Sequence, residues 1–274
     1  MYHRLVADPA SVYDRTPEDF RAELERLARE DYVPITTAEL ASGRIDIPAG
    51  KHPVVLTFDD GDPTVLTLGP DGTPAPGTAV RILLDVAAAH PGFRPVASMY
   101  VNADPYGGGA AGEAALRWLH GNGFEIGNHT FGHTNLRTAS TERALRDIAR
   151  GDEYIRNAVP GYEPSTLALP FGARPGDEDL AVQGPGYDYT AALLVGANPA
   201  PSPFSADFDP VAVPRIRSQG PDGKEADFGS TAWLDKLAAN PENRYTSDGN
   251  PDVISYPTGE DEPAERYADS AVSY

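Results

Sequence analysis

Short apolar segments alternate with amphipathic helical segments along most of the chain, and several of the apolar segments end in polar residues. The clearest example runs from Pro53 to Phe58 and stops at Asp59 and Asp60. Its β-branched, apolar composition is typical of a buried strand in a parallel sheet. The alternation predicts an α/β fold with a mostly parallel sheet, either closed as a barrel or open and doubly wound. Further strands are expected at residues 95–101, 124–129, 166–170, 187–195 and 211–216.

The N-terminal region adds one strand and one helix to this pattern. Residues 1–6 are apolar enough for a first strand. Thr16 is an expected helix cap, because Pro17 follows at the first helical position and apolar residues then recur at helical spacing. Further helices are expected around residues 79–86, 113–119 and 145–155, the last one interrupted near Gly151.

Length and charge limit the domain organisation and the partners. We assign residues 1–257 to one catalytic domain and the acidic, polar residues 258–274 to a flexible tail. The 41 acidic and 22 basic residues leave a net charge of −19, which disfavours nucleic acids and anionic membrane surfaces as partners. No apolar run approaches the roughly 18 to 20 residues of a membrane span.

The chain has no cysteine, so a metal site can use only His, Asp and Glu. His129 and His133 form an H-x3-H pair, which is weak evidence alone because histidines often fall four residues apart. Asp59 and Asp60 form a second pair, for which a cap or turn before Gly61 is the alternative explanation. Together they predict a site in which two imidazoles and one carboxylate bind a divalent ion such as zinc, while the other carboxylate acts as a base.

Three motifs carry a family resemblance. Thr57-Phe-Asp-Asp-Gly61, His129-Thr-Phe-Gly-His133 and Leu169-Pro-Phe-Gly172, in this order, resemble the first three motifs of the polysaccharide deacetylases, carbohydrate esterase family 4. The resemblance implies a distorted, incomplete (β/α) barrel. It implies that Asp59 is the catalytic base and that the backbone N–H of Phe171 helps to stabilise the oxyanion. It also assigns the metal to Asp60, His129 and His133.

The chain departs from the family pattern around its third and fourth motifs. Ala168 stands where the family usually has an arginine that orients the base, and the usual Asp-x-x-Asp-Trp motif is missing around residues 191–203. Losing both together is a coherent change. We hypothesise that Arg215, in Val-Pro-Arg-Ile-Arg, supplies the missing guanidinium. The alternative is that Arg215 is an ordinary surface residue of a strand.

No histidine follows His133, although the family usually has a late histidine that protonates the leaving group. The chain instead begins Tyr2-His3-Arg4, which resembles the circularly permuted branch of the family, similar to the poly-N-acetylglucosamine deacetylases. That resemblance implies that His3 is the general acid. The alternative is that His3 lies in a ragged terminus without a role.

The expected function is metal-dependent removal of acetyl groups from a polysaccharide, either an N-acetylglucosamine polymer or acetylated xylan. The expected ion is zinc, with cobalt, nickel or manganese as alternatives. The rival is a catalytically weak or inactive carbohydrate-binding protein that retains the metal site. The resemblance further implies a secreted or cell-envelope protein whose targeting segment precedes Met1. Possible stacking platforms for a sugar are Tyr100, Tyr106 and Trp118, although most aromatic residues at such positions belong to the core.

Overall fold

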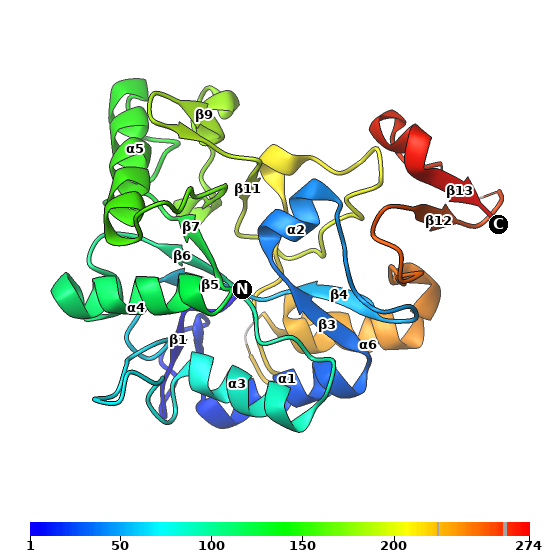
Figure 1. Cartoon of the computed structure of the whole chain (residues 1–274), viewed down its shortest axis with the longest axis horizontal. Helices are drawn as coiled ribbons and strands as arrows, with labels where there is room; N and C mark the ends of the chain where they lie inside the picture. The colour runs from blue at the N-terminus through cyan, green and yellow to red at the C-terminus, as the bar shows by residue number, and fades with distance from the viewer. Residues whose placement is uncertain (224, 260–261) are drawn as a thin grey trace.

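The computed structural model describes residues 1–223, 225–259 and 262–274, and a curled parallel sheet lies at its centre (Figure 1). The five strands of this sheet are ordered β11-β8-β7-β6-β5, and every neighbouring pair runs parallel. They are β5 (Thr57–Asp60), β6 (Ser98–Val101), β7 (Glu125–Asn128), β8 (Thr166–Ala168) and β11 (Ala191–Leu193).

Two further segments extend the sheet and bring its edges together. Residues 1–5 lie along β5 through a parallel bridge at Tyr2, and residues 213–218 lie along β11 through a parallel bridge at Val213. The two segments meet where the Ser218 N–H donates to the Met1 carbonyl at 3.0 Å. Among the described residues these contacts are isolated bridges rather than paired strands, so the barrel is distorted and incomplete, as the family resemblance implies.

Helices cover the outside of the strands and bury the main apolar core. In Figure 1, α1 (Pro17–Arg29), α3 (Ala79–Ala89), α4 (Gly109–Gly121) and α5 (Thr141–Ala158) lie around β5, β6 and β7. Thr16 caps α1 by accepting a hydrogen bond from the Asp19 N–H, as predicted. The other helices are α2 (Thr37–Ser42) and α6 (Ser230–Ala239), and no described helix is long and apolar enough to cross a membrane.

Several expectations about the elements are wrong. The strand expected at 187–195 is two strands in different sheets, Tyr187–Asp188 and Ala191–Leu193, and the one expected at 211–216 has only an isolated bridge at Val213. Helix α5 continues through Gly151, because this glycine lies against the Asn128 side chain and makes room for it rather than breaking the helix. The strand expected at 53–58 is two strands: β4 (His52–Val55) pairs with β3 (Tyr32–Ile35), and only β5 joins the central sheet. Residues 1–6 form a strand only at β1 (Arg4–Leu5), which pairs with β2 (Asp14–Arg15).

The C-terminal segment has secondary structure in its described part. Strand β13 (Ala271–Ser273) pairs in parallel with β12 (Ile254–Tyr256), and Tyr267 packs against Phe204. Part of the expected flexible tail is therefore paired backbone, while residues 260–261 lie outside the described residues. The domain boundary at 257 stays a prediction. The remaining short elements are β9 (Gln183–Gly184), β10 (Tyr187–Asp188) and the 3-10 turns at 105–107, 170–172, 178–181, 210–212, 226–228, 241–243 and 265–270.

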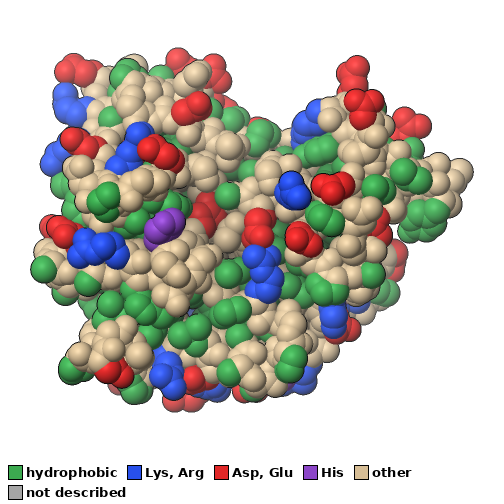
Figure 2. All heavy atoms as spheres, viewed as in Figure 1, with side chains coloured by type: hydrophobic (Ala, Val, Ile, Leu, Met, Phe, Trp, Pro, Cys, Tyr) green, Lys and Arg blue, Asp and Glu red, His purple; other side chains and the backbone are tan. Residues whose placement is uncertain are grey.

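Charged side chains are distributed over the surface in mixed sign. On the face drawn in Figure 2, acidic and basic side chains are interspersed, with apolar side chains between them. Several lie in ion pairs one helical turn apart, such as Arg146 with Glu142 at 3.1 Å. The net charge of −19 is therefore not gathered into one acidic patch on this face.

A buried polar cluster fills the barrel interior at the amino ends of the strands. The Glu125 carboxylate accepts hydrogen bonds from the hydroxyls of Ser98 and Thr166, both at 2.6 Å, and from the Ala38 N–H at 3.1 Å. Because Ala38 belongs to α2, the cluster attaches this helix to the sheet. Burial raises the pKa of Glu125, although its hydrogen bonds oppose the effect.

Replacing Glu125 by Gln should change how stability depends on pH. The pKa of Glu125 is about 4.3 in the unfolded chain and higher in the folded protein. Between the unfolded and the folded pKa of Glu125, the folded state binds more protons than the unfolded state. The contribution of Glu125 to stability therefore falls as pH rises, and Glu125→Gln lacks this loss. Urea unfolding between about pH 4 and 7 should show the stability of Glu125→Gln rising relative to wild type, then levelling. A difference independent of pH would contradict the burial effect.

Candidate active site

The three predicted metal ligands meet at the carboxyl ends of the strands. Asp60 ends β5, and His129 and His133 lie in the loop after β7. The Nε2 atoms of both rings lie 3.5 Å from Asp60 Oδ1, and the three potential ligand atoms all lie within 4.8 Å of one another. This set of two imidazoles and one carboxylate fits a divalent cation of the zinc type and leaves coordination positions for other ligands.

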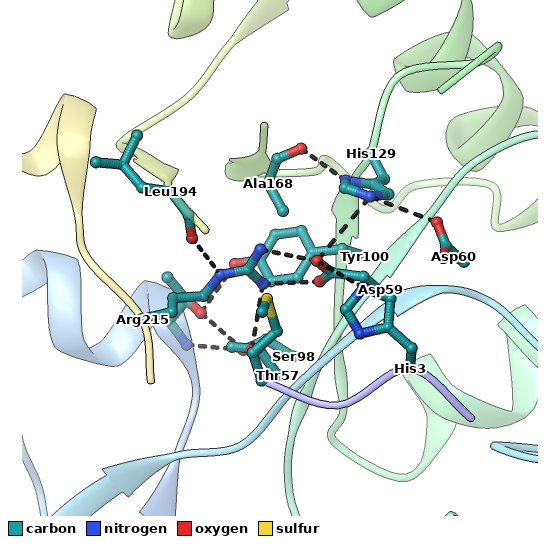
Figure 3. Close-up of polar contacts among 12 residues, drawn as sticks. His3, Thr57, Asp59, Asp60, Ser98, Tyr100, His129, Ala168, Leu194 and Arg215 are labelled. Carbon is teal, nitrogen blue, oxygen red and sulfur yellow. Dashed lines mark hydrogen bonds and ion pairs between the residues drawn. The ribbon is translucent and has the colours of Figure 1, made fainter. Parts of the chain in front are cut away.

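The orientation of His129 is determined by a backbone contact. Its Nδ1–H donates to the Ala168 carbonyl at 2.7 Å, so Nε2 points toward Asp60 (Figure 3). Burial, and then the neighbouring His129, lowers the pKa of His133, so this ring is neutral at pH 7 and its Nε2 can accept a cation.

The loop that carries both histidines is held by Asn128. The Asn128 Oδ1 accepts a hydrogen bond from the Thr130 N–H at 2.8 Å, and its amide group donates to the Ile148 carbonyl in α5 at 2.8 Å. Thr130 and His133 have φ angles of 59° and 50°, in the left-handed region that non-glycine residues rarely adopt. Such backbone strain persists only where surrounding contacts impose it.

Asp59 and Arg215 form a buried ion pair beside the candidate metal site. The Arg215 guanidinium donates two hydrogen bonds of 2.7 Å to the two carboxylate oxygens, and it is itself held by the Leu194 carbonyl at 2.7 Å and by Thr57 Oγ1 at 3.3 Å (Figure 3). Burial raises the pKa of Asp59, but Arg215, followed by His129, outweighs burial and holds the pKa well below its usual range. Asp59 is therefore an ionised acceptor at neutral pH.

His3 approaches Asp59 from the N-terminal segment. Its Nε2 lies 4.0 Å from Asp59 Oδ2, and its ring contacts the Tyr13 ring at a centroid distance of 4.7 Å. Burial lowers the pKa of His3, and the charges of Asp59 and Asp60 partly oppose this effect. The segment therefore places an imidazole within reach of the same space as the Asp59 carboxylate.

Phe171 lies on the opposite side of the site. It has a φ of 60° in the short turn Pro170–Gly172, and the residue is 63% exposed. Its ring packs edge-on against the His133 ring at a centroid distance of 4.6 Å. The following amides of Gly172 and Ala173 donate to carbonyls within the same turn, at 2.9 and 3.0 Å. The turn thus places the Phe171 ring against His133, one of the candidate metal ligands.

Sequence reasoning missed two residues of the site. Asn102, which directly follows β6, donates from its amide to Asp60 Oδ1 at 3.3 Å, and Asn128 supports the histidine loop. Both are polar residues at strand ends, which is the signal that could have found them. The possible sugar platforms are instead core residues: Tyr100 and Tyr106 are 0% and 5% exposed, and Trp118 packs against the main core.

The sequence matches a known family over about half of the chain. The family described as polysaccharide deacetylase matches residues 46–190, a range that leaves His3 and Arg215 outside. A peptidoglycan-N-acetylglucosamine deacetylase from Bacillus cereus is 25% identical over 160 residues, which cover 58% of this chain and 51% of that protein. A probable peptidoglycan-N-acetylglucosamine deacetylase from Arthroderma benhamiae is 25% identical, with coverage of 45% and 24%. The chain therefore spans about half or less of these curated relatives.

Solved structures share the fold over most of the chain. The Streptococcus pyogenes deacetylase PplD, solved in complex with acetate, aligns with a TM-score of 0.61 and 18% identity, covering 86% of this chain and 95% of its own. IcaB from Ammonifex degensii aligns with a TM-score of 0.57 and 19% identity, covering 86% and 93%. The predicted barrel of the polysaccharide deacetylase type is therefore confirmed.

Replacing Gly151 by Ala should disturb the histidine loop from a distance. A Cβ at this position would lie 2.3 Å from Asn128 Oδ1, so the Asn128 side chain must move and release the Thr130 N–H. We expect a loss of about 1–3 kcal/mol in unfolding free energy, together with weaker zinc binding in equilibrium dialysis. Gly121→Ala, at a helical glycine with open space around it, is the matched control and should be neutral or stabilising. Equal behaviour of the two variants would refute the link.

Replacing Arg215 by Met should destabilise the protein strongly, because it leaves the buried Asp59 carboxylate without a partner. We expect a loss of about 3–5 kcal/mol in chemical denaturation. The same change in an Asp59→Asn background should cost much less, since the stranded charge is gone. Arg146→Met, which breaks an exposed pair with Glu142, is the control and should cost about 0.5 kcal/mol or less. A loss for Arg215→Met as small as the control would disprove the coupling.

Proposed function

The chain belongs to the polysaccharide deacetylase family, and on that premise we propose that it removes acetyl groups from a polysaccharide in a reaction that requires a divalent cation. One observation carries the proposal. Asp60, His129 and His133 face one another directly beside an ionised Asp59 that is held by Arg215.

Asp60, His129 and His133 would hold the cation, for which we propose zinc, with cobalt, nickel or manganese as alternatives. A cation held there would polarise the acetyl carbonyl and make a water molecule ionisable near neutral pH. The Asp60 side chain is partly exposed. Its Oδ1 accepts a hydrogen bond from the Asn102 amide and lies 3.5 Å from Nε2 of each imidazole. The neutral state of His133 supports the same assignment.

The other residues of the site would move protons and stabilise charge. Asp59 accepts the proton of the attacking water, because its carboxylate is ionised and Arg215 fixes its two oxygens. The Phe171 N–H donates a hydrogen bond to the oxygen that becomes negative when water attacks the acetyl carbonyl. His3, in its protonated form, gives a proton to the departing amine or alcohol. Acetate and the deacetylated sugar are the products.

The distance of 4.0 Å between His3 and Asp59 supports this division of roles. Base and acid flank one space, so one group can take a proton there while the other gives one. The carboxylates of Asp59 and Asp60 act against the desolvation of His3 and favour the protonated ring that this role needs.

The proposed substrate is an acetylated polysaccharide, either an N-acetylglucosamine polymer or acetylated xylan. The two curated relatives are named for peptidoglycan N-acetylglucosamine, which favours the first. We also propose that the protein is secreted or acts in the cell envelope, since a polymer too large to cross a membrane would be met there.

A binding protein without catalysis is the rival function. Ala168 in place of the expected arginine and the missing Asp-x-x-Asp-Trp motif favoured this rival. The Arg215–Asp59 pair weakens this rival, because the guanidinium reaches the carboxylate from the segment 213–218. A binding-only protein would gain nothing from a buried, paired carboxylate beside two imidazoles.

Acetate release from N-acetylated chito-oligosaccharides and from acetylated xylan tests the proposal. Zinc-loaded wild-type protein should release acetate from at least one substrate, and a chelator should stop it. Asp59→Asn should lower the rate at least about 100-fold, because the general base is lost, while zinc stays bound. Asp60→Ala or His133→Ala should lose both zinc and activity.

The same assay separates the proposal from its alternatives. Undiminished acetate release by Asp59→Asn, or wild-type release that survives complete removal of metal, would contradict the proposed mechanism. Wild-type protein that binds oligosaccharide but releases no acetate with any of the four metals would establish the rival.

A further inference from the structure

The orientation of the His3 ring is not determined by a hydrogen bond among the described residues. Its Nδ1 is buried and has no hydrogen-bond partner there, and its Nε2 lies 4.0 Å from Asp59 Oδ2, beyond hydrogen-bond distance (Figure 3). The His129 ring, by contrast, is fixed by the Ala168 carbonyl. A proton donor acts efficiently only when it is held in one geometry. Packing must therefore orient the His3 ring.

Tyr13 packs on this ring. The parallel pairing of β1 and β2 places Arg4 opposite Asp14, so His3 and Tyr13, which directly precede these two residues, lie side by side. Their ring centroids are 4.7 Å apart. The buried Asp14 carboxylate accepts two hydrogen bonds from the Arg4 guanidinium, at 2.9 and 3.0 Å. This bidentate ion pair holds the two strands in the register that brings the rings together.

Arg217 contacts the Tyr13 ring from the segment 213–218. Its guanidinium lies 4.6 Å from the centroid of that ring and also pairs with the Glu225 carboxylate. A cation at this distance from an aromatic face is attracted to it. Arg217 is two residues after Arg215, a spacing that puts side chains of an extended segment on one side. One segment therefore supports both the proposed base, through Arg215, and the neighbour of the proposed acid.

We propose that Tyr13 is a positioning residue for His3, and that Arg217 holds the Tyr13 ring in place. The stacked rings keep the imidazole beside Asp59, where its proton can reach the departing amine or alcohol. The role requires the aromatic ring of Tyr13 rather than its hydroxyl, because both contacts are made by the ring. This inference rests on the proposed deacetylase function and concerns the proton transfer to the leaving group.

Two substrates with different leaving groups test the role. One is the acetylated oligosaccharide that zinc-loaded wild type deacetylates, whose departing amine or alcohol needs a proton. The other is 4-nitrophenyl acetate, whose phenolate departs without one, measured as the part of the rate that a chelator removes. Tyr13→Leu should lower kcat for the oligosaccharide about 10- to 100-fold and leave KM within about twofold of wild type. Its rate with 4-nitrophenyl acetate should stay within about twofold of wild type.

Three further variants define the contribution of the stack. Tyr13→Phe keeps the ring and should retain kcat within about threefold of wild type. Arg217→Met should lower kcat for the oligosaccharide less than Tyr13→Leu does, because the rings still touch. His3→Gln removes the acid itself, so it should lower the oligosaccharide rate at least as much as Tyr13→Leu and also spare 4-nitrophenyl acetate.

Nuclear magnetic resonance tests the contact without turnover. In the metal-free protein, the His3 ring protons should carry a ring-current shift from Tyr13, which Tyr13→Phe keeps and Tyr13→Leu removes. Loss of signals in His3→Gln assigns these resonances. Tyr274→Leu makes the same substitution at a tyrosine that is 75% exposed and follows β13, and it should leave both rates and the His3 resonances unchanged.

The outcomes separate this role from its alternatives. Equal loss with both substrates in Tyr13→Leu would indicate a structural role, and a raised KM with unchanged kcat would indicate a sugar contact. Either result would overturn the positioning role, as would a loss in Tyr13→Phe as large as in Tyr13→Leu, or a ring-current shift that persists in Tyr13→Leu. Absence of acetate release by zinc-loaded wild type would instead overturn the proposed function, whatever the resonances show.

Discussion

The buried pair of Arg215 and Asp59 is the interaction on which the rest of the site depends. Two parallel hydrogen bonds of 2.7 Å join the guanidinium to the carboxylate, and both side chains are almost completely buried. A buried carboxylate alone would be protonated or would destabilise the fold. With Arg215 in place, Asp59 stays ionised and can accept a proton. Asp60 is partly exposed and faces the two imidazoles, so it is the carboxylate that we propose as the cation ligand.

The Arg215–Asp59 pair also links the candidate active site to the segments that close the barrel. Arg215 belongs to the segment 213–218, which lies between β11 and the N-terminal segment, and its side chain also holds Leu194 and Thr57. The guanidinium therefore links three neighbouring parts of the ring. This arrangement explains how the chain can lack an arginine at position 168, since a side chain from the segment 213–218 reaches the Asp59 carboxylate. The segment that carries Arg215 meets the one that carries His3, so the proposed base and the proposed acid are positioned together.

Residues at strand ends could be predicted from the sequence, whereas contacts between distant segments could not. The rule that parallel strands present their carboxyl ends on one face was enough to bring the Asp59–Asp60 pair to His129 and His133. The family resemblance then selected Asp60 as the ligand. The split of 53–58 into β4 and β5 depends on pairing with β3, and the continuity of α5 at Gly151 depends on Asn128 across the core. Tyr100 and Tyr106 are possible sugar platforms by residue type, but both are buried in the fold, and burial is a tertiary property that the sequence does not give.

Anomalous diffraction at the zinc edge from crystals soaked in zinc tests the central division of labour most directly. The account predicts one strong peak within about 2.0–2.2 Å of the Nε2 atoms of His129 and His133 and of an Asp60 oxygen. Asp59 should remain outside the coordination sphere, with both oxygens on Arg215. A peak coordinated by Asp59, or no peak among these residues, would contradict it.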